Sequence, residues 1–94
     1  MHIIYNAFSF VREKLSKQGL GYLNVSYEVE EGIDAHGLIA KLGLAKSDVE
    51  AVFVNHTVVP KHTILQEGDR VALVPPGTPG SYRLILGLKE MGEA

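Results

Sequence analysis

Residues 65–80 read Leu-Gln-Glu-Gly-Asp-Arg-Val-Ala-Leu-Val-Pro-Pro-Gly-Thr-Pro-Gly, and this stretch decides the fold. Gly68 and Asp69 predict a tight turn into a strand at 70–74, whose residues after Arg70 are all apolar, and such an apolar run is typical of a strand buried near the centre of a sheet. Pro75 and Pro76 then end that strand, because proline has no N–H group to donate to a neighbouring strand.

Four further strands are predicted upstream of this turn. Residues 51–54 and 58–59 are β-rich and flank a tight hairpin turn at Asn55, which tolerates a positive φ. Residues 2–10 are rich in aromatic and β-branched side chains and predict a first strand. Residues 22–30 predict a second strand with one buried face, on which we expect Leu23, Val25, Tyr27 and Val29.

Two helical segments are expected between these strands. Val11 and Leu15 indicate a short helical turn that ends near Gly19. Asp34 is a candidate N-cap for the main helix, and Gly43 fits the left-handed position after its end. Gly37 lies inside that helix and should weaken it by up to about 1 kcal/mol relative to alanine, so we expect packing on the sheet to stabilise it.

This order of elements predicts an α+β protein with the β-grasp (ubiquitin-like) fold, in which a mixed sheet of four to five strands packs on one main helix. A chain of 94 residues is the size of one domain. We therefore expect a β-grasp domain over residues 1–80 and a C-terminal extension over 81–94, packed on the domain or on a partner.

Composition excludes several classes of function. Apolar residues make up 46% and charged residues 21%, as in ordinary globular chains, and the net charge of −2 provides no positive field for nucleic acid. The chain has no cysteine, and its four histidines lack carboxylates at ligand spacing, so neither a metal site nor a catalytic residue is expected. No apolar run reaches the length of a membrane span and no secretory leader is visible, so we expect a soluble, cytoplasmic protein without a cofactor.

Several short motifs occur in an order that resembles the MoaD/ThiS family of ubiquitin-like sulfur carriers. Residues 8–13, Phe-Ser-Phe-Val-Arg-Glu, are similar to the string that closes the first strand in carriers of the molybdopterin-synthase small-subunit type. Val54-Asn55, the Gly68-Asp69 turn with Val71, and Pro75-Pro76 are similar to later elements of the family. The resemblance covers about residues 3–80.

The resemblance implies a carrier that is itself no enzyme and that delivers sulfur as a C-terminal thiocarboxylate for molybdenum or tungsten cofactor biosynthesis. Its implied partners are an E1-like adenylating enzyme and a molybdopterin-synthase-like large subunit, and the sulfur-carrying carboxylate would belong to Gly80. The residues expected to bind partners are Phe8, Arg12, Pro75, Pro76, Gly77, Tyr82, Leu84 and Leu86.

The sequence departs from the family pattern at the expected terminus. The Gly80 carbonyl is bonded to Ser81, and Pro79 stands where a glycine is expected. The carrier function therefore requires cleavage after Gly80. The alternative is a β-grasp interaction module that docks a larger enzyme through its extension.

The extension itself is open to two interpretations. Tyr82, Leu84 and Leu86 alternate as in a strand, whereas Leu84 and Leu88 lie on one face of a helix. Covering each large apolar side chain is worth roughly 1.5 to 3 kcal/mol. We expect the extension to cover the chain's own sheet or, alternatively, to bind another subunit, including a second copy in a homodimer.

Overall fold

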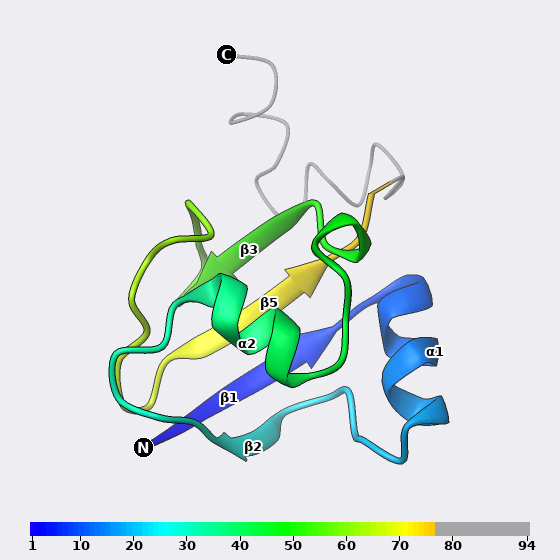
Figure 1. The fold of residues 1–94 in the computed structure, drawn as a ribbon, viewed down its shortest axis with the longest axis horizontal. Helices are drawn as coiled ribbons and strands as arrows, with labels where there is room; N and C mark the ends of the chain where they lie inside the picture. Colours follow the sequence, from blue (N-terminus) through cyan, green and yellow to red (C-terminus); the bar gives the residue numbers. More distant parts are fainter. Residues whose placement is uncertain (77–94) are drawn as a thin grey trace.

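The structure is a computed structural model that describes residues 1–76 (Figure 1). Its elements in chain order are β1 (His2–Ala7), α1 (Ser9–Lys17), β2 (Val25–Glu28), α2 (Ala35–Lys41), the 3-10 helix η1 (Lys46–Asp48), β3 (Ala51–Val54), β4 (Thr57–Val59) and β5 (Arg70–Val74). Extension residues 81–94 lie outside the described residues.

The strands form one five-stranded sheet in the order β2-β1-β5-β3-β4. The last strand, β5, occupies the centre, where it pairs in parallel with β1 and antiparallel with β3. The registers place Tyr5 opposite Val71 and Phe53 opposite Ala72. The predicted β-grasp fold and the central position of strand 70–74 are confirmed.

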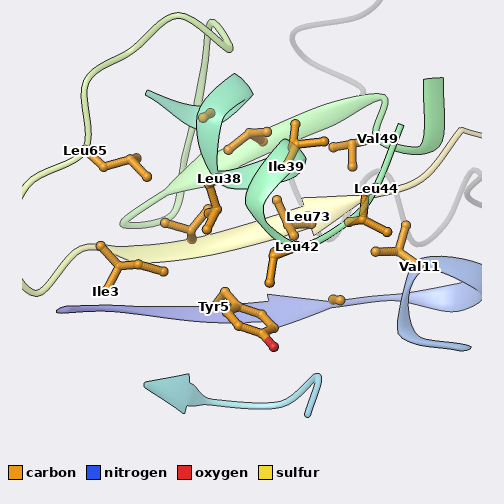
Figure 2. Packing of buried hydrophobic residues seen from close by; sticks show 14 of the residues in the cluster. Ile3, Tyr5, Val11, Leu38, Ile39, Leu42, Leu44, Val49, Leu65 and Leu73 are labelled. Atoms are coloured by element: carbon orange, nitrogen blue, oxygen red, sulfur yellow. The ribbon is translucent and has the colours of Figure 1, made fainter. Parts of the chain in front are cut away.

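The main core lies between the sheet and α2, which crosses one face of the sheet (Figure 1). From the sheet, Ile3 and Tyr5 of β1 and Leu73 of β5 point toward this core, and each is fully buried. From α2 and its C-terminal end, the buried Leu38, Ile39 and Leu42 point back at the sheet (Figure 2). Burying each such side chain contributes roughly 1.5 to 3 kcal/mol, so the short helix depends on the sheet.

The predicted ends of α2 are confirmed. The Asp34 carboxylate accepts a hydrogen bond from the Gly37 N–H at 2.8 Å, as an N-cap does. Gly43 has φ of +76°, and Leu44 after it is buried. A Cβ added at Gly37 would lie 2.7 Å from Ile33 Cγ1, so this glycine allows the chain that enters the helix to pack closely against it.

Two element boundaries differ from the predictions. β1 ends at Ala7, and residues 9 and 10 already belong to α1, because Ser9 adopts a left-handed φ of 53° that turns the chain out of the sheet. β2 begins only at Val25, and Leu23 is 67% exposed, so its predicted place on a buried face was wrong. Asn24 has φ of 49°, which interrupts the extended backbone after Leu23.

The predicted hairpin and the turn into β5 are connected by side chains. Asn55 and His56 both have positive φ, as a two-residue turn of this kind requires. Asn55 Nδ2 donates to Asp69 Oδ1 at 3.0 Å, and Asn55 Oδ1 accepts from the Arg70 N–H at 3.0 Å. The β3–β4 hairpin therefore fixes the start of the central strand.

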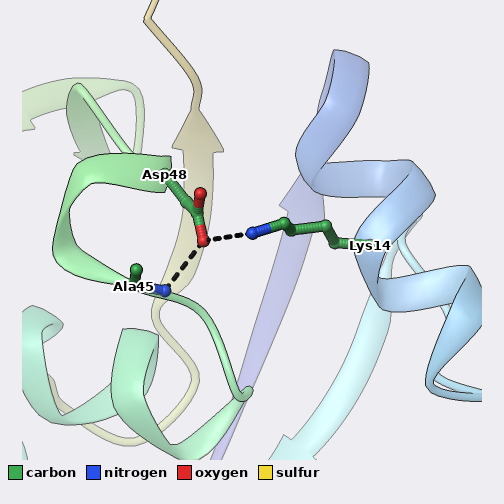
Figure 3. A network of polar contacts seen from close by, with 3 residues as sticks. All are labelled: Lys14, Ala45 and Asp48. Atoms are coloured by element: carbon green, nitrogen blue, oxygen red, sulfur yellow. Dashed lines mark hydrogen bonds and ion pairs between the residues drawn. The ribbon is translucent and has the colours of Figure 1, made fainter.

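An ion pair connects α1 to η1 (Figure 3). Lys14 Nζ lies 2.9 Å from Asp48 Oδ2, and the same oxygen accepts the Ala45 N–H at 2.8 Å. The bond from Lys14 and then the bond from Ala45 lower the pKa of the Asp48 carboxyl below its usual range near 3.8. The Asp48 side chain is 12% exposed and that of Lys14 is 49% exposed, so solvent screens the lysine more than the carboxylate.

Asp48→Asn should lower the free energy of unfolding at pH 7 by about 1 kcal/mol, because it removes a charge-assisted pair. A lowered carboxyl pKa stabilises the fold fully above the usual value and loses this effect as the pH falls through the lowered one. Urea unfolding from pH 7 down to pH 2 should therefore show the difference from the wild type shrinking below about pH 4. Lys17→Met on the same helix is the control. If the difference in the free energy of unfolding between Asp48→Asn and the wild type does not change with pH, the lowered pKa of Asp48 does not stabilise the fold.

Candidate partner-binding face

The chain leaves the sheet at the end of its central strand. At this end the Val74 carbonyl accepts a hydrogen bond from the Glu50 N–H, at 2.7 Å. Pro75 is buried and Pro76 is exposed, and neither can donate to a ladder. Of the residues expected at the site, Gly77, Gly80, Tyr82, Leu84 and Leu86 lie outside the described residues.

An apolar cluster lies on the face of the sheet opposite α2, next to this exit. Successive residues of a strand point to opposite faces, so Val71 and Leu73 enter the main core whereas Ala72 and Val74 point to the second face. We call this group the second-face cluster, and its members are Phe8, Ala51, Phe53, Val58, Ala72 and Val74.

The strand registers make the second-face cluster contiguous. Phe53 lies opposite Ala72 on β5 and opposite Val58 on β4, and Ala51 lies opposite Val74. Val74 is 0% exposed and Phe53 is 5% exposed, while the other members are half-buried. The cluster thus has a buried centre and an apolar rim that extends across the sheet to β4.

A polar network borders the cluster on the side away from the exit. Arg70 shares the parity of Ala72 and Val74 on β5, and its Nη1 donates to Asn24 Oδ1 at 3.3 Å. The Asn24 N–H donates to Asn6 Oδ1 at 2.9 Å, and Asn6 lies opposite Ala72. The apolar surface therefore ends at a cationic side chain that its neighbours hold in place.

The structure brings some of the predicted partner-binding residues together and separates another. Phe8 belongs to the second-face cluster, and Pro75 and Pro76 follow directly from Val74. Arg12 instead projects from α1, with its guanidinium 5.1 Å from the centre of the Tyr22 ring. Arg12 is exposed, but this cation–π contact gives it a role within the molecule.

The sequence reasoning missed most of the second-face cluster. The run at 70–74 predicts one buried strand, but its parity separates Ala72 and Val74 from the core-facing residues. The hairpin shows the same alternation: Val52 and Val54 face the core side of the sheet, so Phe53 between them points to the second face. Assigning these residues to a face requires the register, which the sequence did not supply.

Two observations on the described residues bear on other kinds of site. Within residues 1–76, no three His, Cys, Asp or Glu side chains are grouped so that they could hold a metal ion. In the same part of the chain, no helix is long and apolar enough to span a membrane.

Comparison with solved structures defines the class of fold. A crystal structure of small archaeal modifier protein 1 from H. volcanii is similar with a TM-score of 0.61 at 17% identity, covering 80% of this chain and 97% of that chain. A structure of SAMP1 from Haloferax volcanii gives a TM-score of 0.60 at 15% identity, covering 85% of this chain and 100% of that chain. This similarity shows a ubiquitin-like β-grasp fold.

The family follows from the sequence. The sequence model of the ThiS family matches residues 11–80, which is most of the chain. No curated protein matches the chain. The chain belongs to the ThiS family of small ubiquitin-like sulfur carriers, whose members generally work with E1-like enzymes.

Ser9 directs the chain from Phe8 into α1 and has a left-handed backbone. Glycine and alanine variants at this position should therefore differ in stability in the opposite order from the same variants inside the helix. A glycine adopts this φ without strain, so Ser9→Gly should be more stable than Ser9→Ala by about 0.5 to 1 kcal/mol. At Ser16, within the same helix, the order should reverse, because alanine favours a helix over glycine. Thermal unfolding of the four variants measures both differences, and the same order at both positions would contradict a strained Ser9.

Proposed function

We propose that this protein is a sulfur carrier whose reactive group is the carboxylate of Gly80, released by cleavage of the bond between Gly80 and Ser81. One observation carries the proposal: the family match runs from the first helix to residue 80 and ends there, although the chain continues for fourteen residues. The end of the match at residue 80 supports Gly80 as the terminus of the processed carrier. The exit of the chain from the centre of the sheet beside an apolar face supports the same conclusion.

The chemistry needs only a terminal carboxylate from the carrier. In the proposed sequence, an E1-like adenylating enzyme joins that carboxylate to the AMP part of ATP and releases pyrophosphate. Sulfide then attacks the adenylated carbonyl carbon and displaces AMP, so that sulfur replaces one carboxylate oxygen. The resulting thiocarboxylate passes its sulfur to a cofactor precursor, and the catalytic residues of each step belong to the partners.

Residues 77–80 supply the backbone that enters the partner. Gly77 and Gly80 have no Cβ, so their backbone can approach the reacting groups closely. Pro79 keeps φ near −65° and has no N–H group, so a partner channel must accept this residue without a hydrogen bond. We expect the channel of the cognate enzyme to be adapted to proline at this position.

We assign partner docking to the second-face cluster and the adjoining Pro75 and Pro76. An apolar patch with a polar border is the usual composition of a protein interface. Its proposed partners are the adenylating enzyme and a molybdopterin-synthase-like large subunit in the cytoplasm. The string at residues 8–13 favours molybdenum or tungsten cofactor biosynthesis as the acceptor pathway.

A second candidate function rests on the extension. Residues 81–94 contain Tyr82, Leu84, Leu86 and other large apolar side chains that a simple carrier tail does not need. In this alternative the chain stays intact and docks a larger enzyme, or a second copy of itself, through the extension. Deleting residues 81–94 would then abolish co-purification of that partner, whereas the carrier proposal expects partner binding to persist.

Intact-mass spectrometry of the protein from its native host tests the carrier proposal. We expect a species that ends at Gly80, a fraction of which carries the mass increment of one oxygen replaced by sulfur. Iodoacetamide should alkylate that fraction alone, because the chain has no cysteine that could react instead. Only full-length protein without a sulfur increment would contradict the proposal.

Val58→Asp in the form ending at Gly80 should weaken capture of the adenylating enzyme by about tenfold, because it places a charge in an apolar interface. His56→Asp is the matched control, since His56 is an exposed turn residue of the same hairpin outside the cluster. Quantitative mass spectrometry of captured proteins gives the comparison. Equal losses for both variants, or none for Val58→Asp, would remove the second-face cluster from the interface.

A further inference from the structure

The centre of the second-face cluster is buried, although it lies on the face of the sheet opposite α2. The partly buried hydrophobic residues that pack against Phe53 and Val74 include Phe8, which follows β1, and Ala51, Val58 and Ala72 of the sheet. Alternate side chains of a strand point to the same face, so Ala51, Val58 and Ala72 stand beside Phe53 and Val74 on this face. The helix α2 packs on the opposite face, yet Val74 is 0% exposed and Phe53 is 5% exposed.

The chain itself supplies a segment suited to this surface. Residues 81–94 carry Tyr82, Leu84, Ile85, Leu86, Leu88 and Met91. Only Pro75, Pro76 and residues 77–80 separate this segment from Val74, the centre of the cluster. The segment is therefore held next to the surface by a short tether.

The length of residues 81–94 is also sufficient to span the second-face cluster. From β1 to β4 the cluster crosses three strand spacings, or about 14 Å. Fourteen residues extend about 21 Å as a helix and about 45 Å as a strand, so either conformation reaches across it. A tether of this length keeps the local concentration of the segment on the order of millimolar, so even weak apolar contacts keep it bound.

We propose that residues 81–94 fold over the second-face cluster of their own chain and block partner docking until the bond after Gly80 is cut. An endopeptidase adds water across this amide, leaving a carboxylate on Gly80 and an ammonium on Ser81. The freed peptide loses its tether and dissociates from the face. One hydrolysis therefore creates the reactive carboxylate and uncovers the surface that its activating partner needs, which prevents the uncut precursor from occupying the enzyme.

This inference rests on the proposed function for its consequence, but the cover itself can be tested separately. The absence of cysteine allows a single reporter, Ala72→Cys, at a half-buried member of the second-face cluster beside Phe53. In the full-length chain we expect its reaction rate with a thiol reagent to rise at least about tenfold when Leu84→Asp and Leu86→Asp are added. A reference reporter, Ser26→Cys on the exposed part of β2, should react at the same rate in both chains.

The controls make each outcome decisive. Thermal unfolding of every variant must be cooperative, and the acidic substitutions lie outside residues 3–74, which contain the core. Equal reaction rates of the Ala72→Cys reporter with both tails would overturn the proposal, and protection that disappears on dilution would overturn it in favour of a second copy. A native-host mass spectrum without a chain ending at Gly80 would contradict the carrier chemistry without altering the protection of this reporter, so the two failures are distinguishable.

Discussion

The position of β5 between β1 and β3 is the constraint on which the rest of this structure depends. The last strand of the sheet must insert between two strands that come earlier in the chain, one of them parallel to it. The turn at Gly68 and Asp69 makes this possible: the Gly68 N–H donates to the His2 carbonyl at 2.8 Å, and the Ile4 N–H donates to the Asp69 carbonyl at 2.9 Å. The start of β1 and the start of β5 are therefore held together by backbone contacts.

The central place of β5 also explains why its end is suited to function. A central strand buries side chains on both faces, so Leu73 stabilises the core under α2 while Val74 contributes to the opposite apolar surface. The double proline after Val74 ends the ladder and releases the chain beside that surface. Fold stability and the presentation of the C-terminal segment thus depend on the same five residues.

Features that depend on a few neighbouring residues could be predicted from the sequence, whereas features that depend on contacts between distant segments could not. The Asp34 cap, the Asn55 turn and the Gly68-Asp69 turn were predictable, because each depends on the conformational preference of one or two residues. Leu23 was misassigned because alternation continues through Asn24, whose left-handed backbone is fixed by a contact to Asn6 on another strand. The second-face cluster required the strand register, which depends on contacts between distant segments.

The central claim is that Gly80 becomes the activated terminus and that the uncut chain is not a substrate. ATP–pyrophosphate exchange by the adenylating enzyme of the same host measures the first chemical step directly. We predict rapid exchange with the chain ending at Gly80, which retains the buried core described within residues 3–74, and none above background with the full-length chain. Exchange supported equally by the full-length chain, or by neither form, would contradict the account.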